Sequence, residues 1–301
     1  MSSSSDTQPQ PLRAAGHRVR GRWGGVALAA TTLLLAGCSL VSLAYNRVPT
    51  IAYWRLDAML DLNGAQSAIA RQELDRWHAW HRREHLPRYA QALQRWQTLL
   101  AQDVTPAQVC EAVDVLRGWA QEAGQQALPL AVRLAPTLSD AQLQHWQRHQ
   151  AEQEAEFKAD FVAEGGGVAP KRLQRATDRV EMIYGRLSAE QRTWWRERLQ
   201  RSAFDPARTL FQRRQRFNDW TAIVSRIQAG AVPVEEVQGA WRRVWQPASA
   251  AEAAADQAQW TDGCALLAEW HNRTTPAQRQ TAQQRLQSYA MEFVTLARTD
   301  L

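Results

Sequence analysis

A short pattern recurs at the starts of the expected helices and limits what this chain can fold into. A residue with a small polar side chain stands three positions before a Gln, ahead of a run with helical periodicity. The first side chain can accept a hydrogen bond from an unpaired N–H of the first turn, and the Gln can bond back to the cap N–H. The pattern occurs at Asn63–Gln66, Thr105–Gln108, Ser139–Gln142, Ser188–Gln191 and Thr275–Gln278, with a related start at Asp205-Pro206.

The apolar side chains that follow these starts are spaced three and four residues apart, as one face of a helix requires. Two clear examples are Leu173–Leu187 and Phe217–Ile227. No segment alternates with the period of two that a half-buried strand shows. We therefore predict an all-α fold, a bundle of about nine or ten helices, in which Pro87 kinks or ends its helix.

The first 37 residues have the three zones of a bacterial export signal. Arginines between Arg13 and Arg22 precede an apolar run from Val26 to Leu35. A helix of about ten residues rises about 15 Å, too little to cross a hydrocarbon core of ~30 Å. Such a run is typical of the central region of a signal peptide, so we predict that residues 1–37 are removed.

The sequence Leu35-Ala36-Gly37-Cys38 ends this segment and resembles the lipobox of bacterial lipoproteins. The resemblance implies cleavage before Cys38, which then carries a diacylglycerol on its thiol and an N-acyl chain, its only expected non-protein group. Two or more acyl chains hold a protein stably on a membrane. Ser39 follows in place of the Asp of inner-membrane lipoproteins, so we expect the periplasmic face of the outer membrane.

Behind the anchor we expect a tether over residues 38–47 and a helical domain over residues 48–301. Gly165–Gly167 interrupts the domain, either as a loop within one domain or as the boundary between two halves, split at 165–167. The segment Tyr45–Leu60 is expected to pack against the body or to lie near the membrane.

The net charge limits the classes of partner that the protein can bind, and the cysteine content bears on the redox state of its compartment. The formal net charge is +6, and residues 1–37 hold four Arg and one Asp, so 6 − 3 leaves +3 on the mature chain. That field is too weak to indicate a nucleic-acid-binding protein. In an oxidising compartment Cys110 and Cys264 can form a disulfide, although two separate buried thiols are the alternative.

Two histidine pairs are candidate metal ligands. His81-Arg82-Arg83-Glu84-His85 matches the H-x-x-E-H pattern of one class of zinc peptidase, which also needs a distant third ligand. His145 and His149 are four residues apart on one helix face, a spacing that can hold Zn²⁺ or Cu²⁺. In both cases the alternative is a solvated polar face, so we predict no metal site and no catalytic residues.

Tryptophans lie among arginines along much of the chain. One interpretation is an amphipathic surface for an acidic glycan, a lipid headgroup or an unfolded client, which rings and guanidinium groups together can bind. The other is core packing with Arg stems laid over the rings. The residues concerned are Trp77, Trp80, Trp96, Trp194, Trp195, Trp220, Trp241 and Trp245.

Two sets of motifs resemble known families. Leu43-Ala-Tyr-Asn46, Tyr53-Trp54-x-Leu56-Asp57 and Asp61–Gln66 are similar to a family of uncharacterised proteobacterial lipoproteins, which implies no particular activity. Leu138-Ser-x-x-Gln142 and Leu187-Ser-x-x-Gln191 are similar to the Leu-Thr-x-x-Gln motif of the Spy/CpxP family of periplasmic chaperones.

These observations together predict a membrane-anchored lipoprotein that faces the periplasm and is not an enzyme. Its partner is expected to be an envelope protein or the cell wall. A chaperone or envelope-stress binder of the Spy/CpxP kind is the alternative, and a zinc-dependent hydrolase that uses His81 and His85 is a remote one.

Overall fold

The computed structural model of the protein describes residues 41–163, 167–230, 232–247 and 249–298. The predicted export signal, the lipobox Leu35–Gly37 and Cys38 lie outside the described residues. Residues 41–301 belong to one compact unit. Among the described residues, no helix has both the length and the apolar character needed to cross a bilayer.

Within the described parts the chain is all-α and contains no strand, as predicted. Besides the helical residues 41–46, these parts contain eleven α-helices, against the nine or ten expected. One of them is a short helix that follows α4 directly at Ala127 and has no side-chain cap. The elements are α2 (Val48–Leu60), α3 (Gly64–Leu99), α4 (Pro106–Gln126), α5 (Leu128–Leu134), η1 (Ala135–Thr137), α6 (Asp140–Phe161), α7 (Pro170–Tyr184), α8 (Ala189–Gln200), α9 (Pro206–Ala229), α10 (Val234–Val244), α11 (Ala250–Asn272) and α12 (Pro276–Arg298).

The predicted helix starts are confirmed by their capping hydrogen bonds. Helices α3, α4, α6 and α8 each begin with a complete reciprocal box. At α12, Thr275 N donates to Gln278 Oε1 (3.0 Å) and Gln278 N donates to Thr275 Oγ1 (3.2 Å). The Asp205 carboxylate accepts from two backbone N–H groups at the start of α9. Local sequence therefore sets where these helices begin.

Helix α3 continues through Pro87, so the expectation that the helix ends there is wrong. The proline removes one backbone hydrogen bond, but α3 packs along α12 on both sides of this point. Before Pro87, Arg82 Nη1 donates to Leu296 O (3.5 Å), and after it Gln283 Nε2 donates to Gln97 O (3.2 Å). Tertiary packing thus offsets the local cost.

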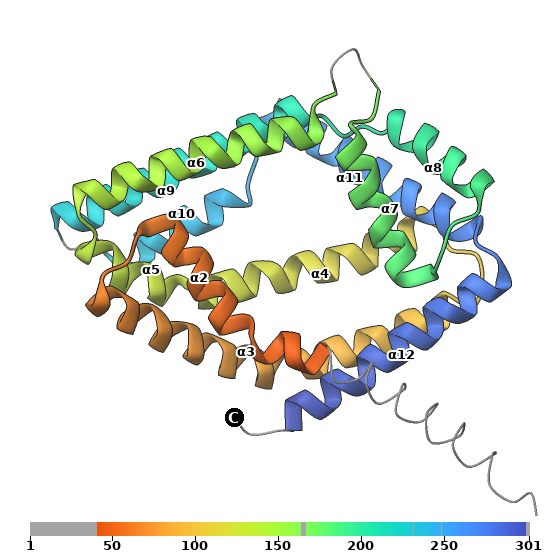
Figure 1. Cartoon of the computed structure of the whole chain (residues 1–301), viewed down its shortest axis with the longest axis horizontal. Coiled ribbons are helices and arrows are strands. Elements are labelled where there is room, and N and C mark those ends of the chain that lie inside the picture. Colours follow the sequence, from red (N-terminus) through yellow and green to blue (C-terminus); the bar gives the residue numbers. More distant parts are fainter. Residues whose placement is uncertain (1–40, 164–166, 231, 248, 299–301) are drawn as a thin grey trace, which may run out of the picture. The chain divides into compact units, whose positions relative to one another are not determined.

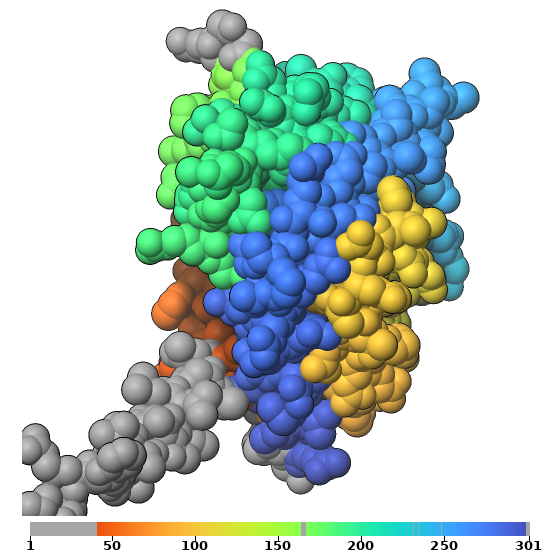
Figure 2. Space-filling view, turned by 90° about the vertical axis from the view of Figure 1, so that its right-hand side faces the viewer, coloured from red at the N-terminus to blue at the C-terminus, as the bar shows by residue number. Residues whose placement is uncertain are grey.

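The helices contact one another in a closed circuit. Helix α3 packs on α2, α2 on α6, α6 on α7, α7 on α12 and α12 again on α3, and α6 and α9 run side by side (Figure 1). Helix α11 packs on α4 and α8. In Figure 2 the blue surface of the last two helices lies between the yellow surface of residues near 100 and the green surface of α7 and α8.

Two reciprocal glutamine pairs join capping boxes that lie far apart in the sequence. Gln66 and Gln142 exchange side-chain hydrogen bonds of 3.1 and 2.7 Å, and so bind the start of α3 to the start of α6. Gln191 and Gln278 do the same for α8 and α12, at 2.8 and 3.0 Å. The similar motifs at Gln142 and Gln191 therefore belong to different pairs.

Each glutamine pair is next to one of two hydrophobic clusters. Leu187, one residue before the α8 cap, packs with Trp195 and Trp270, of which only 2% and 1% are exposed. Leu138, one residue before the α6 cap, packs with Leu60 and Val224. The Leu of the Leu-Ser-x-x-Gln motif is thus a core residue, and its Gln is a helix connector.

Residues 41–46, placed by prediction in the tether, are helical and packed against the body. The Ser42 hydroxyl donates to Glu292 Oε2 (2.6 Å), the Tyr45 hydroxyl lies 2.9 Å from His81 Nδ1, and Arg82 donates to Asn46. The described body therefore begins only three residues after Cys38.

Candidate functional site

The histidines of the H-x-x-E-H pattern lie in a buried aromatic cluster on α3. His81 and His85 stack at 4.9 Å between ring centroids, and only 8% and 0% of their surfaces are exposed. Both ring nitrogens of His81 bond to tyrosine hydroxyls: Nδ1 to Tyr45 (2.9 Å) and Nε2 to Tyr89 (3.0 Å). Both ring nitrogens of His81 are therefore already engaged in hydrogen bonds within the protein.

Burial keeps this cluster uncharged near neutral pH. Burial is the main reason why the pKa of His81 is lowered to about 4, and the neighbouring His85 and His78 contribute to that shift. Burial also lowers the pKa of His85, although Glu122, 3.7 Å from its Nε2, opposes that shift. These neutral rings suit a packed interior.

His145 and His149, the second candidate pair, lie on α6. His145 Nε2 bonds to the backbone oxygen of Ala58 on α2, at 3.0 Å, which fixes its ring against that helix. Within the described ranges, no three His, Cys, Asp or Glu side chains are placed to hold one metal ion.

Cys110 of α4 and Cys264 of α11 form a disulfide, with their Cα atoms 5.3 Å apart. The bond joins two helices that also pack on each other. It closes a loop across 154 positions of sequence, so it links distant parts of the fold. Of the predicted site residues, these two cysteines are brought into covalent contact.

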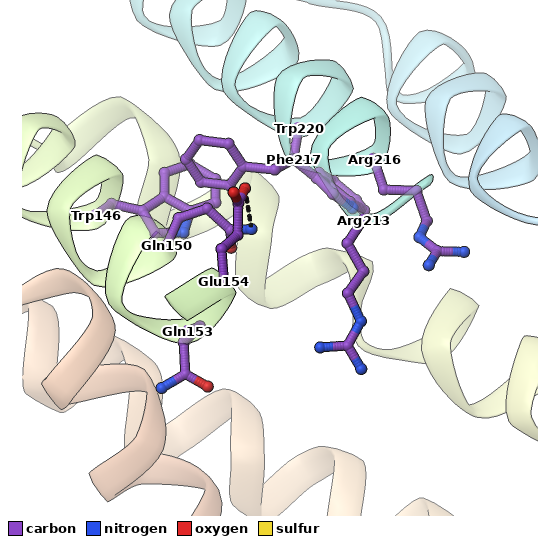
Figure 3. A pocket seen from close by; sticks show the side chains of 8 residues that line it. All are labelled: Trp146, Gln150, Gln153, Glu154, Arg213, Arg216, Phe217 and Trp220. Carbon is purple, nitrogen blue, oxygen red and sulfur yellow. Dashed lines mark hydrogen bonds between the residues drawn. The ribbon is translucent and has the colours of Figure 1, made fainter. Parts of the chain in front are cut away.

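A groove runs between α6 and α9, lined by aromatic and cationic side chains (Figure 3). It encloses about 360 Å³. On its aromatic side, Trp146 and Phe217 meet edge to face at 5.1 Å between centroids. Trp220 completes this wall, while the guanidinium groups of Arg213 and Arg216 extend from α9 away from the Trp146–Phe217 pair.

The groove carries positive charge. Two guanidinium groups, those of Arg213 and Arg216, line it, and burial, followed by the charge of Arg213, lowers the pKa of Arg216. The carboxylate of Glu154 is held by Arg214 at 2.7 Å, so it does not neutralise that pair. An anionic group placed between Arg213 and Arg216 would relieve their repulsion.

A second hollow lies between α7, α11 and the segment that joins α8 to α9. Arg172 lies 4.5 Å over the Phe204 ring, and Arg175 lies 5.4 Å over the Phe161 ring. Arg179 lines the same hollow, one helical turn beyond Arg175. Burial lowers the pKa of Arg172, although Asp262, which lines the same hollow, opposes that shift. Arg172 Nη2 already donates to Ser202 Oγ (2.6 Å), and Arg175 pairs with the buried Asp160.

Stacked rings connect the two hollows. Phe157, under the Arg213 guanidinium at 4.2 Å, stacks on Phe161 at 4.7 Å, and Phe161 lies 6.1 Å from Phe204. Phe157 itself is buried, with 5% of its surface exposed, so this ring joins the two hollows beneath the surface. We call the two hollows together with the rings between them the arginine–aromatic strip. It consists of Trp146, Phe157, Phe161, Arg172, Arg175, Arg179, Phe204, Arg213, Arg216, Phe217 and Trp220.

Sequence reasoning identified only Trp220 of this strip. Among the other tryptophans that it singled out, Trp195 is a core residue with 2% of its surface exposed. A usable signal existed on α6, where Trp146, Phe157 and Phe161 follow at helical spacings of 11 and 4. The contributions of α7 and α9 depend on tertiary packing and have no local signature.

Comparison with known proteins places the strip inside a matched region. The sequence profile described as "Family of unknown function (DUF6279)" matches residues 58–227, more than half of the chain and every strip residue. No curated protein and no solved structure matches the chain.

Proposed function

Because the chain belongs to the DUF6279 family, whose function is unknown, we propose a role from its own residues: a lipid-anchored envelope protein that faces the periplasm and binds a partner without catalysis. The lipobox at Cys38 supports the anchor. The Cys110–Cys264 disulfide supports the compartment, since such bonds persist where the environment is oxidising.

The observation that carries the binding role is that both hollows of the arginine–aromatic strip combine guanidinium groups with aromatic rings. Guanidinium groups hold carboxylates through paired hydrogen bonds, and aromatic rings take up apolar side chains. Arginine stays protonated at neutral pH and cannot act as a base. A surface made of these two residue types therefore suits binding better than chemistry.

The dimensions of the strip favour an elongated partner. Trp146 and Phe161 are 15 residues apart on α6, which corresponds to about 22 Å along a helix. An extended polypeptide of about seven residues covers that length. We propose that the partner is an extended segment of an envelope protein that carries both acidic and apolar side chains.

Photo-crosslinking in intact cells tests this proposal. A benzophenone amino acid replaces Gln153, which lines the α6–α9 groove, and in a matched control it replaces the exposed Gln287 on α12. We expect a discrete protein adduct from position 153 only, and its loss in the variant Arg213→Glu/Arg216→Glu. Equal adducts from both positions, or adducts only to glycan, would contradict the proposed partner.

A holding activity towards unfolded proteins is the second candidate. The exposed Phe211 on α9, 49% accessible, adds an apolar contact on the helix that supplies Arg213 and Arg216. A chaperone of this kind suppresses client aggregation at stoichiometric amounts, which light scattering measures. The reversal of both arginines leaves that suppression intact for a purely apolar client, and abolishes it for a client bound through acidic side chains.

A further inference from the structure

An exposed stripe follows the N-terminal helical segment and α2 from residue 43 to residue 58. A helix turns about 100° per residue, which places seven residues within about a third of the circumference. All seven are exposed, and none is acidic: Leu43, Ala44, Arg47, Ile51, Trp54, Arg55 and Ala58.

The opposite side of this segment is occupied by the body. Tyr53 is buried, with its hydroxyl 3.0 Å from Ser67 Oγ, and Leu60 joins a hydrophobic cluster. Asp57 lies at the border between the two sides, and its carboxylate accepts from Leu62 N at 3.1 Å. The exposed apolar side chains are therefore not core residues of this chain: Trp54 is 62%, Leu43 55% and Ile51 43% accessible.

The length of chain before the stripe indicates what covers it. Cys38 precedes Leu43 by five residues, and a fully extended chain spans at most about 3.5 Å per residue. A lipid on Cys38 thus lies no more than about 18 Å from the stripe, whatever path the chain takes. Because the anchor is so close, this face reaches the membrane surface more readily than it reaches any other partner.

The chemistry of the stripe matches that surface. Trp is favoured at the boundary between headgroups and acyl chains, and Leu and Ile can enter the acyl region. Arg side chains extend their charged ends to lipid phosphates while their stems stay in the apolar layer. Two arginines without a carboxylate among them favour an anionic leaflet.

We propose that this stripe is a membrane-docking face that inserts into the headgroup region of an anionic phospholipid leaflet and orients the body. The inference depends on the lipid anchor of the proposed function. It adds that the helical body lies against the membrane through α2 in one defined orientation, and does not swing freely on its lipid.

Spin labelling of the full-length mature lipoprotein on vesicles of phosphatidylethanolamine and phosphatidylglycerol tests the docking face. A nitroxide is attached at Trp54→Cys, and in a matched control at Gln200→Cys on α8, which is also exposed. Collision rates with oxygen and with a water-soluble nickel chelate report immersion. We expect their ratio to rise several-fold at position 54 when vesicles are added, and to stay constant at position 200.

A second reporter separates docking from anchoring. In the variant Ile51→Cys/Trp54→Glu, the label at position 51 should become accessible to the nickel chelate, while the protein still floats with the vesicles through its lipid. Labels at 54 and 200 that are equally accessible on floating vesicles overturn the docking face and leave the anchor intact. A protein that does not float overturns the anchor and, with it, the inference.

Discussion

The glutamine pairs predict that two capping boxes of the same form, Asn63–Gln66 and Thr105–Gln108, contribute very differently to stability. Gln66 is 1% exposed and its side chain makes four hydrogen bonds. Its Oε1 accepts from Asn63 N (3.0 Å) and Gln142 Nε2 (2.7 Å), and its Nε2 donates to Thr137 O (2.7 Å) and Gln142 Oε1 (3.1 Å). The side-chain bonds of Gln108 all go to its own cap, Thr105.

The difference in free energy of unfolding follows from these bonds. A hydrogen bond contributes about 1 kcal/mol net, and more when its removal leaves a buried partner unpaired. Gln66→Ala should therefore cost about 4 kcal/mol, whereas Gln108→Ala removes one cap interaction and should cost about 1 kcal/mol. The two substitutions have the same local chemistry, so the contrast isolates the tertiary pairing.

Urea unfolding followed by circular dichroism at the helix band measures both losses by linear extrapolation. The double variant Gln66→Ala/Gln142→Ala should lose about 2 kcal/mol less than the sum of the single variants, because the two side chains share two hydrogen bonds. Equal losses for Gln66→Ala and Gln108→Ala, or strictly additive losses in the double variant, would refute the reasoning.

Three further predictions concern the disulfide, the histidine cluster and α4. The variant Cys110→Ala/Cys264→Ala should lose up to about 5 kcal/mol of unfolding free energy, because the disulfide closes a loop of 154 positions in the unfolded chain. If reductant does not lower the urea midpoint of the natural protein, this prediction is contradicted. The pKa of His81 is about 4 when folded and 6.5 ordinarily, so its contribution to stability is complete above pH 6.5 and lost as the pH falls towards 4. The urea midpoint should fall over that range, and less steeply in His81→Gln; identical slopes would remove His81 as the cause. A Cβ at Gly118 meets no atom within 4 Å, so Gly118→Ala should stabilise α4 by up to about 1 kcal/mol. A Cβ at Gly124 would lie 2.0 Å from the Trp241 ring, so Gly124→Ala should destabilise the protein by about 1–3 kcal/mol. Thermal melts compare the two variants, and equal shifts in melting temperature would contradict the packing of α4 on Trp241.

Helix starts could be predicted from sequence because they depend on neighbours three residues apart. The hydrogen bonds between Ser139 and Gln142, or between Ser188 and Gln191, form wherever the helix forms. The position at which a helix ends depends less on the local sequence. Pro87 sits inside α3 because contacts with α12 on both sides outweigh the missing backbone bond, and nothing near Pro87 in the sequence indicates those contacts.

The candidate site was harder to predict than the fold for the same reason. The side chains of Gln66 and Gln142 bond across 76 positions of sequence, and the motif alone indicates only a cap. Likewise, Arg213 contacts Phe157 across the α6–α9 interface, so neither residue is distinctive in its own helix. The H-x-x-E-H pattern was distinctive in sequence, yet His81 and His85 are buried among tyrosine and tryptophan rings.

We propose that lipid on Cys38 holds this body at a membrane, and intact mass spectrometry of the protein purified from its own envelope tests that proposal. We predict a chain that begins at Cys38 and carries diacylglycerol and an N-acyl chain, and a Cys38→Ala variant that is neither processed nor modified. A mature protein that begins elsewhere, or one with an unmodified thiol at Cys38, would contradict the account.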